Sequence, residues 1–341
     1  MAAGRRSDVT RRINLALQGG GAHGAFTWGV LDRLLDEEDL EIAGISGTSA
    51  GALNGAALKS GWLIDGRDGA RENLDWLWRQ MGAIDAPAFP EWMGIAQMSN
   101  SVGSSLPYLW AESLERMISP YATGPFYTNP LRRVAERFDY DRVCAHDGPR
   151  LFVGATNVRS GKIRVFEGGD ISTDALLASA CLPTLFRAVE IDGEAYWDGG
   201  YTGNPALFPL FAPDLPGDIV IVNINPLERN EVPRTPQDIR NRINEISFNS
   251  SLLREMRAIA FAQRLLDEGR MKRGEMKQLN LHMIADDALM NELSVATKIV
   301  PIPDVIARLK AAGRQAAQAF LDAHGDDLGQ RGSVDLAGIY G

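Results

Sequence analysis

Residues 13–24 read Ile-Asn-Leu-Ala-Leu-Gln-Gly-Gly-Gly-Ala-His-Gly, a short apolar run that leads into three consecutive glycines. A run of this kind, bounded by a glycine turn, is typical of a buried parallel strand. Within residues 22–37, apolar side chains then recur every four positions, at Phe26, Val30 and Leu34. This spacing predicts a helix directly after the glycine turn.

A second strand and a second helix follow immediately. Residues 41–46 are mostly apolar and lead into Gly47, and residues 50–59 consist largely of small side chains. The order strand, helix, strand, helix is typical of a parallel sheet that is covered by helices on both faces. The sequence therefore predicts an α/β fold of three layers, α/β/α, with a mostly parallel central sheet.

The rest of the chain supplies further elements for the same fold. The patterns predict helices at 69–82, 130–138, 236–246, 249–268 and 303–323, hairpins of 151–157 with 162–166 and of 189–192 with 195–198, and strands at 218–224 and 279–284. We divide the chain into a disordered basic tail at 1–12, a catalytic domain at 13–230 and a mostly helical extension at 231–341. We expect the extension to pack on the same domain, because strand 279–284 is expected to rejoin the sheet.

The composition excludes several classes of protein. The chain has 341 residues and a formal net charge of −9, with 35 Lys and Arg against 44 Asp and Glu. An acidic chain lacks the basic surplus that sequence-independent nucleic-acid binding needs, so no nucleic-acid partner is expected. Two cysteines, Cys144 and Cys181, form neither a disulfide framework nor a metal-ligand spacing.

The N-terminal segment does not resemble a secretory signal. It is basic, with Arg5, Arg6, Arg11 and Arg12, but no apolar region with a cleavage site follows it. No stretch approaches the roughly 18 apolar residues that span a bilayer. We expect a cytoplasmic protein whose first residues form a frayed, solvated tail; contact of these arginines with anionic headgroups is the alternative.

Gly47-Thr-Ser-Ala-Gly51 matches the pattern GxSxG between a predicted strand and a predicted helix. In a nucleophile elbow, the glycines relieve crowding in a sharp turn and leave the serine hydroxyl exposed at a helix N-terminus. Free N–H groups and the helix dipole favour negative charge there. We therefore interpret Ser49 as a catalytic nucleophile, with a tight structural turn as the alternative.

Gly19-Gly-Gly-Ala-His-Gly24 also lies between a strand and a helix, and it allows two functional interpretations. As G-x-G-x-x-G it fits a dinucleotide fingerprint, but the acidic residue at the required spacing, Glu41, falls at the wrong end of the second strand. Alternatively, the N–H groups of the turn lie beside Ser49, because adjacent parallel strands end at the same sheet edge. There they would form an oxyanion hole. A turn with no catalytic role is the third possibility.

A base must accept the proton of Ser49, and the sequence offers His282 or Asp198. The order Ser49, Asp198, His282 is that of an α/β-hydrolase triad, yet His282 lies inside a predicted strand, where triad histidines are unusual. His23 could also reach the site, although a role in anchoring the glycine turn fits it equally. His146 and His324 lie in polar segments. Asp198 precedes two glycines at the end of a strand, and the segment Ser179-Ala-Cys-Leu-Pro183 comes before it.

Together these motifs resemble the patatin-like phospholipase family. The glycine turn, the GxSxG elbow, the S-A-x-x-P segment and the D-G-G motif occur in family order between Gly19 and Gly200, and the similarity extends to about Ile224. The resemblance implies a Ser–Asp dyad without histidine, with Ser49 as nucleophile and Asp198 as base. It also implies that the oxyanion donors are backbone N–H groups, those of Gly19, Gly20, Gly21 and Ala50.

The sequence departs from the family at two places. Family members often carry Asp before the glycines and Arg or Lys two places after them, where this chain has Gln18 and His23. The helix-rich region after residue 236 resembles an extension of a bacterial subgroup. Both departures are compatible with acyl-ester chemistry, and both bear on whether phospholipid is the substrate.

Residues 87–127 are rich in Pro, Gly, Ser and large apolar side chains. The segment is too long for a simple connection. We interpret it as a lid or groove wall in which Trp92, Met98, Leu109 and Trp110 contact an acyl chain, with core packing as the alternative.

The sequence thus predicts a serine acyl hydrolase of lipid-like esters that needs no cofactor and no metal. An esterase of short acyl or hydroxyalkanoate oligomer esters is the first alternative, and a non-catalytic lipid-binding module is the second. The expected partners are a lipid or acyl-ester substrate and a lipid surface contacted peripherally, and a homo-oligomer is compatible with the sequence.

Overall fold

The computed structural model describes residues 10–82, 93, 95–103, 105, 119–122, 127–229, 231–272, 274 and 276–340. The strands are β1 (Arg11–Leu17), β2 (Leu40–Thr48), β3 (Arg150–Asn157), β4 (Ile163–Glu167), β5 (Val189–Ile191), β6 (Glu194–Asp198), β7 (Asp218–Asn223) and β8 (Asn280–Ala285). The helices are α1 (Gly24–Leu34), α2 (Ala50–Met81), α3 (Ile95–Gly103), α5 (Arg132–Ala135), α6 (Tyr140–Val143), α7 (Thr173–Ser179), α8 (Pro236–Asp267), α9 (Asp287–Glu292), α10 (Val295–Ile299), α11 (Pro303–His324) and α12 (Leu336–Tyr340).

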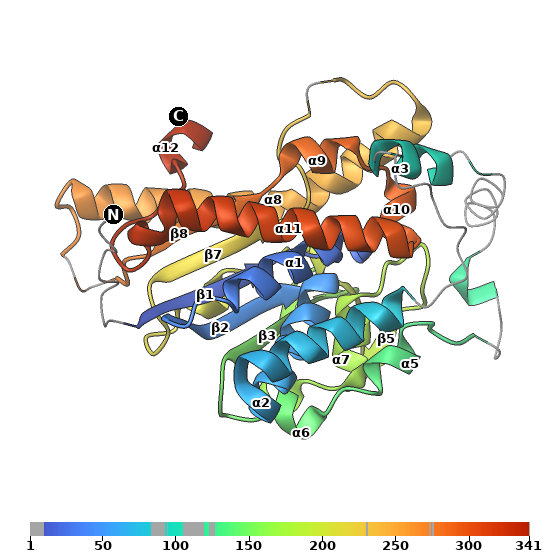
Figure 1. Ribbon diagram of the computed structural model, residues 1–341, viewed down its shortest axis with the longest axis horizontal. Coiled ribbons are helices and arrows are strands. Elements are labelled where there is room, and N and C mark those ends of the chain that lie inside the picture. The colour runs from blue at the N-terminus through green and yellow to red at the C-terminus, as the bar shows by residue number, and fades with distance from the viewer. Residues whose placement is uncertain are drawn as a thin grey trace, which may run out of the picture.

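The strands form one mixed sheet in the order β5-β6-β3-β2-β1-β7-β8, with β4 also paired to β3. Figure 1 shows β1 between β2 and β7 in this sheet. The five strands from β3 to β8 in this order run parallel to their neighbours. Strands β4, β5 and β6 form the antiparallel end of the sheet. The predicted parallel sheet is therefore confirmed, and β8 rejoins it beside β7 as expected.

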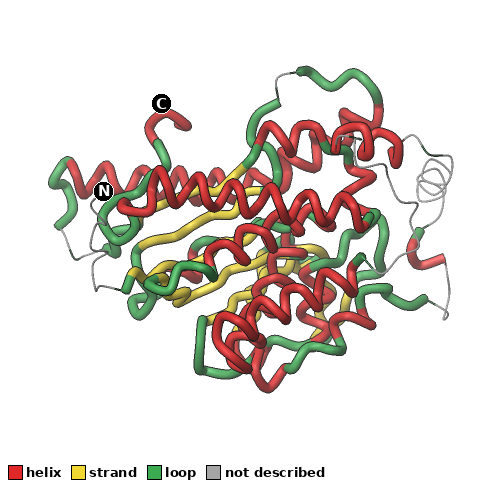
Figure 2. The backbone as a smooth tube through the Cα atoms, viewed as in Figure 1, coloured by secondary structure: helices red, strands yellow, loops and turns green. Residues whose placement is uncertain are grey.

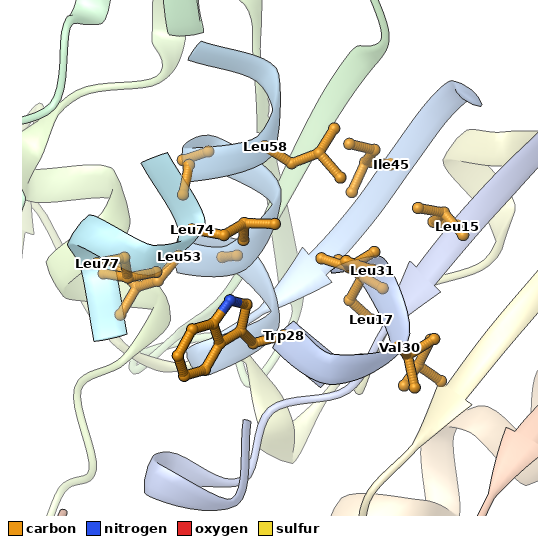
Figure 3. Packing of buried hydrophobic residues seen from close by; sticks show 14 of the residues in the cluster. Leu15, Leu17, Trp28, Val30, Leu31, Ile45, Leu53, Leu58, Leu74 and Leu77 are labelled. Carbon is orange, nitrogen blue, oxygen red and sulfur yellow. The ribbon is translucent and has the colours of Figure 1, made fainter. Parts of the chain in front are cut away.

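Successive side chains of the central strands belong alternately to two separate hydrophobic cores. Leu15 and Leu17 of β1 pack with α1 and α2, and Figure 3 shows them facing Leu31 of α1. Ala16 of β1 belongs to the cluster on the opposite face, with Leu252 of α8. Because successive side chains of a strand point to opposite faces, both faces of this sheet must be covered. Helices cover both faces, which gives the three layers α/β/α (Figure 2).

The C-terminal part of the chain contributes to both helical layers. Helix α11 lies along α1 (Figure 1). Its buried Leu309 and Phe320 belong to the core cluster of α1 and α2. Helix α8 covers the other face through Leu252, Met256 and Ile259. The region after residue 231 is thus built into the same layers as the motif-bearing half.

Two predicted pairs of helices are each continuous in the structure. Helix α2 runs from Ala50 to Met81 with a kink at Asp65 and Gly66, where Gly66 has a φ of 53°. Helix α8 is uninterrupted through the polar stretch around Asn249, where the pattern predicted a break. The helix continues there because the Asn249 side chain bonds to groups outside the helix, the side chain of Gln18 and the carbonyls of Asn225 and Pro226.

The boundary of the predicted basic tail is wrong at Arg11 and Arg12. These residues open β1, paired in register with Leu40 and Glu41. Arg11 donates a hydrogen bond to Asp39 at 2.9 Å, and Arg12 donates one to Glu41 at the same distance. The neighbouring acidic side chains thus hold both arginines in the sheet, which leaves neither of them in a frayed tail.

Among the helices that the structure describes, none combines the length and the apolar composition needed to cross a bilayer.

Candidate active site

Ser49 lies in the sharp turn between β2 and α2. Its backbone has a φ of 55° and a ψ of −122°. Residues other than glycine rarely adopt a positive φ. Strained backbone of this kind occurs at nucleophile elbows. Gly51 is needed for the turn, since a Cβ on it would lie 2.1 Å from the carbonyl oxygen of Leu17. The residue types of the motif therefore follow from how closely α2 approaches β1.

Asp198 ends β6 and lies beside Ser49. The residue is 1% exposed, and its Oδ1 accepts a hydrogen bond from the Gly200 N–H at 2.8 Å. The Ser49 hydroxyl lies close enough to this side chain to favour its charged form, as the Gly200 N–H does. Burial outweighs both effects and raises the pKa of Asp198 to about 7. The pair thus has the contact and the proton affinity of a nucleophile with its base.

The segment 179–183 holds both of these residues in place. The Ser179 Oγ accepts a hydrogen bond from the Ser49 N–H at 2.9 Å. Two residues later, the Cys181 carbonyl accepts one from the Asp198 N–H at 2.8 Å. The S-A-x-x-P pattern was part of the family resemblance, and its physical task is to join the strand of Asp198 to the turn of Ser49.

The glycine turn divides into an anchored part and a free part. The Gly19 N–H donates to the Asn204 Oδ1 at 2.7 Å, so this N–H is engaged within the protein. The N–H groups of Gly20, Gly21 and Ala50 have no partner in the described part of the chain. All three residues line the cavity that contains Ser49. Three of the four predicted oxyanion donors are thus available, and Gly19 serves as the anchor.

Gln18, at the position where family members often carry Asp, fixes the start of the glycine turn through side-chain hydrogen bonds. Its Oε1 accepts hydrogen bonds from the backbone N–H groups of Ile224 and Asn225. Its Nε2 donates to the Asn204 carbonyl and to Asn249. The amide satisfies donors and acceptors at once, which a carboxylate cannot do.

A cavity of about 470 Å³ opens above Ser49 and Asp198. Its walls are mostly apolar and come from distant parts of the chain: Leu53, Leu77, Trp78, Met81, Leu131, Val134, Leu182, Leu185, Phe186, Phe248 and Ile299. Its polar lining includes Asn225, Glu245 and Lys298. An apolar cleft with a few convergent polar groups is typical of a small-molecule site, and this one suits a flexible acyl chain.

Comparison with known proteins agrees with this geometry. A family model described as patatin-like phospholipase matches residues 15–211, which span the glycine turn, the elbow and Asp198. The chain belongs to the patatin-like phospholipase family. Membership of this family supports the hydrolysis of lipid esters.

Two solved structures are similar to this chain at low sequence identity. VipD from Legionella pneumophila is 17% identical, with a TM-score of 0.40, over 92% of this chain and 67% of that chain. The complex of ExoU and SpcU from the type III secretion system of Pseudomonas aeruginosa gives 18% identity and a TM-score of 0.31, over 98% and 66%. The chain thus spans about two thirds of either neighbour. No curated protein matches it.

None of the four histidines lines the cavity of this patatin-like protein. His282 is fully buried in β8, with its Nε2 3.0 Å from Asp218 and its Nδ1 3.1 Å from Ser333. His23 lies beneath the glycine turn, 2.9 Å from the Thr297 Oγ1. Burial lowers the pKa of His23 well below its usual value, with the charge of Lys298 adding to the effect. His146 and His324 lie outside the cavity as well.

The dinucleotide interpretation of the glycine turn has no counterpart in the structure. Glu41 lies at the opposite end of β2 from Ser49 and is paired with Arg12. Among the described residues, no group of three or more His, Cys, Asp or Glu side chains could hold a metal ion.

Of the four residues predicted to contact the acyl chain, only Met98 is described. It is fully buried in the hydrophobic core, on α3, and is not among the cavity residues. Trp92, Leu109 and Trp110, like most of the predicted lid, lie outside the described residues. The described walls come instead from residues next to the motifs, such as Leu53 after the elbow and Leu182 after Cys181. Their position beside the motifs is the signal that could have identified them.

Replacing Ser179 with alanine is expected to lower kcat about tenfold while KM changes little. The variant leaves the Ser49 N–H without its side-chain acceptor, and an unmade buried hydrogen bond costs about 1–3 kcal/mol, here in the positioning of the nucleophile. Steady-state kinetics on a nitrophenyl ester measure the effect. Ser250→Ala serves as the control, since among the described residues that hydroxyl bonds only to the Ser247 carbonyl within α8. An equal loss in both variants would contradict the positioning role.

Proposed function

We propose that this protein is a serine acyl hydrolase that cleaves carboxylic esters of lipid-like substrates through a Ser49–Asp198 dyad. The observation that carries the proposal is the placement of the strained Ser49 beside a buried, high-pKa Asp198 in one apolar cavity. The absence of every histidine from the lining supports a dyad over a triad.

In the first half of the reaction, the Ser49 Oγ attacks the ester carbonyl carbon as its proton moves to Asp198. The free N–H groups of Gly20, Gly21 and Ala50 stabilise the oxyanion, and each such donor contributes about 3–4 kcal/mol to the lowering of the barrier. The tetrahedral intermediate collapses, the ester C–O bond breaks, and the alcohol leaves with the proton from Asp198.

In the second half, the same carboxylate activates water. Asp198 accepts a proton from the water as its oxygen attacks the acyl-enzyme. The bond to Ser49 breaks, Ser49 regains the proton, and the fatty acid leaves. The raised pKa suits this dual role, because a carboxyl group that titrates near neutrality both accepts and returns a proton.

The rate should depend on pH through Asp198. Below a pH of about 7 the carboxyl group is protonated and cannot accept the Ser49 proton, so kcat/KM is expected to rise about tenfold per pH unit there and to level off above it. A pH profile of nitrophenyl ester hydrolysis measures this, with circular dichroism at each pH to confirm folding. A midpoint near the ordinary pKa of aspartate would contradict the assignment of the base.

The chain length of the best substrate tests the cavity. Each methylene buried in the apolar lining contributes about 0.8 kcal/mol, so kcat/KM should climb with acyl length until the cavity is full. Leu131→Trp reduces the cavity and should move the optimum to shorter esters. Ile64→Trp, at a position that is 56% exposed on α2 outside the cavity, is the matched control.

The same assay separates the alternatives. Nitrophenyl esters of increasing length, run beside phospholipids, should show activity that rises toward long chains. An optimum at very short chains would favour an esterase of short acyl or hydroxyalkanoate esters instead. A contribution of Trp92, Leu109 and Trp110 to the acyl groove stays a prediction, tested by the effect of their alanine variants on this profile.

A further inference from the structure

The cavity has a cationic corner beside the glycine turn, formed by Lys298. This residue belongs to α10 and lines the cavity together with Ser49. A Cβ on Gly21 would lie 2.2 Å from the Lys298 carbonyl oxygen, so the two backbones are in direct contact. The lysine side chain therefore starts next to an oxyanion donor.

Within the described residues, the Lys298 ammonium makes one hydrogen bond and no ion pair. Its Nζ donates to the Asn225 Oδ1 at 3.1 Å, and no carboxylate lies within 4.0 Å. The Asn225 amide is itself fixed, because its Nδ2 donates to Gln18 at 3.1 Å and to the Gly19 carbonyl at 2.8 Å. An ammonium group has three N–H donors. Two donors of Lys298 are thus left for a ligand.

The surrounding charges leave a positive surplus at this corner. The carboxylate that acts on Lys298 is Glu245, which is 3% exposed. Glu245 already accepts hydrogen bonds from Arg229 at 2.6 and 3.1 Å and from Arg242 at 3.4 Å. Three cations therefore surround one carboxylate. Burial lowers the pKa of Lys298, which reflects a charge without full compensation.

We propose that Lys298, held by Asn225, forms a subsite for an anionic group of the ester substrate. The proposal rests on the proposed function, because the anion is expected on the molecule whose ester reaches Ser49. Because the backbones of Lys298 and Gly21 are in contact, an anion bound by the Lys298 ammonium lies no farther from the glycine turn than the length of a lysine side chain. Only a few bonds then separate the anionic group of the substrate from the scissile ester. The apolar walls receive the acyl chain.

Two kinds of substrate carry an anion at such a position. In a glycerophospholipid, a phosphate lies a few bonds from the acyl ester, and in an acylated hydroxy acid a carboxylate does so. Both satisfy an ammonium group through charge-assisted hydrogen bonds. A neutral glyceride offers neither. The shared chemistry is an oxyanion near the ester, and matched substrates distinguish the two sources.

The experiment compares anionic and neutral esters of equal acyl length. The phosphate pair is 1-decanoylglycerol 3-phosphate with 1-decanoylglycerol, and the carboxylate pair is 3-(decanoyloxy)butanoic acid with its methyl ester. The measured quantity is the ratio of kcat/KM within each pair. The variants are Lys298→Met, Lys298→Arg and Arg133→Met, the last removing an exposed cation that lines the same cavity. Lys162→Met, on an exposed turn, controls for net charge.

Lys298→Met is expected to lower the ratio at least about tenfold for the phosphate pair, the carboxylate pair or both, and the affected pair names the source. Lys298→Arg should preserve most of the ratio, because it keeps the charge. Arg133→Met and Lys162→Met should leave the ratio unchanged. The proposal is overturned if Lys298→Met lowers both members of each pair equally, or if Arg133→Met alone removes the discrimination.

A binding measurement separates this proposal from the proposed function. With Ser49→Ala protein, calorimetry compares decyl phosphate, monodecyl succinate and decanol. Adding Lys298→Met should weaken at least one of the two anions about tenfold or more and leave decanol unchanged. If the wild-type protein cleaves no ester, this arm alone decides on the subsite. Equal affinity of each anion for the two proteins would overturn it.

Discussion

Ser49→Ala is expected to lower kcat by about four orders of magnitude or more and to abolish covalent labelling by a fluorophosphonate. Loss of a catalytic nucleophile removes the acyl-enzyme route entirely, which leaves only the contribution of oxyanion stabilisation and binding. The fold should survive, because the substitution deletes one oxygen from a side chain that is 8% exposed and keeps the Cβ. Hydrolysis of a nitrophenyl ester and gel-based labelling measure the two effects.

Ser160→Ala provides the matched control for this experiment. Ser160 lies on the exposed turn between β3 and β4, and in the described part of the chain its hydroxyl bonds only to Asn157 and the Lys162 N–H. That variant should be labelled and should turn over substrate like the wild type. Turnover by a folded Ser49→Ala protein at a comparable rate would contradict the assignment of the nucleophile.

Asp198→Asn should be almost as inactive as Ser49→Ala, with a kcat about a thousandfold or more below that of the wild type. The amide oxygen still accepts the hydrogen bond from Gly200, so the turn is kept, but an amide does not accept the proton of Ser49.

His282→Ala and His146→Ala should keep most of the activity per folded molecule. The folded fraction is measured by circular dichroism, because His282 is fully buried and its loss removes one of the hydrogen-bond partners of Asp218. An inactive but folded His282→Ala protein would establish a triad.

The Asp198→Asn variant should be more stable than the wild type at alkaline pH. The pKa of Asp198 is raised from 3.8 to about 7 in the folded state, so the folded protein binds the proton more tightly than the unfolded chain does. Stability therefore falls as the pH rises between these values, and the cost of the buried charge is fully present above pH 7. At about 1.36 kcal/mol per unit, Asp198→Asn removes a penalty of up to about 4 kcal/mol.

Thermal unfolding at two pH values checks this sign. The gain in Tm from Asp198→Asn should be large at about pH 8 and small at about pH 4, where the wild-type carboxyl is protonated in the folded protein. A gain that is independent of pH would show that burial of charge is not its cause. Stability gained with loss of activity is the trade-off expected of a strained active site.

The sequence predicted those parts of the fold and site that depend on neighbouring residues. The buried strands β1, β2 and β7 follow from local runs such as 13–17, and the position of Ser49 follows from its glycines. The residues around Asp198 predicted a turn at the end of a strand, but its assignment as the base came from the family resemblance, because the residues alone left His282 as an alternative. Each of these features is decided within a few residues along the chain, so a single sequence contains enough information.

Features that depend on contacts between distant residues could not be predicted. Gln18 looked like a departure from the family, and only its contacts with residues 204, 225 and 249 reveal its function. Asn249 was expected near a helix break for the same reason. The role of Ser179 depends on the hydrogen bond between the end of α7 and the Ser49 N–H, which joins residues far apart in the sequence. Lys298 belongs to no local sequence motif.

The contact between Gly21 and Lys298 has a consequence for biosynthesis. A nascent chain exposes Ser49 early and Asp198 next, while the network around the glycine turn still lacks Asn225 and Asn249 and the cavity lacks α10. A polypeptide that has emerged only through β6 therefore carries Ser49 and Asp198 but lacks α10, which contacts the glycine turn. Under the proposed function, we expect hydrolytic activity to be acquired only late in translation, when α10 has packed against this turn.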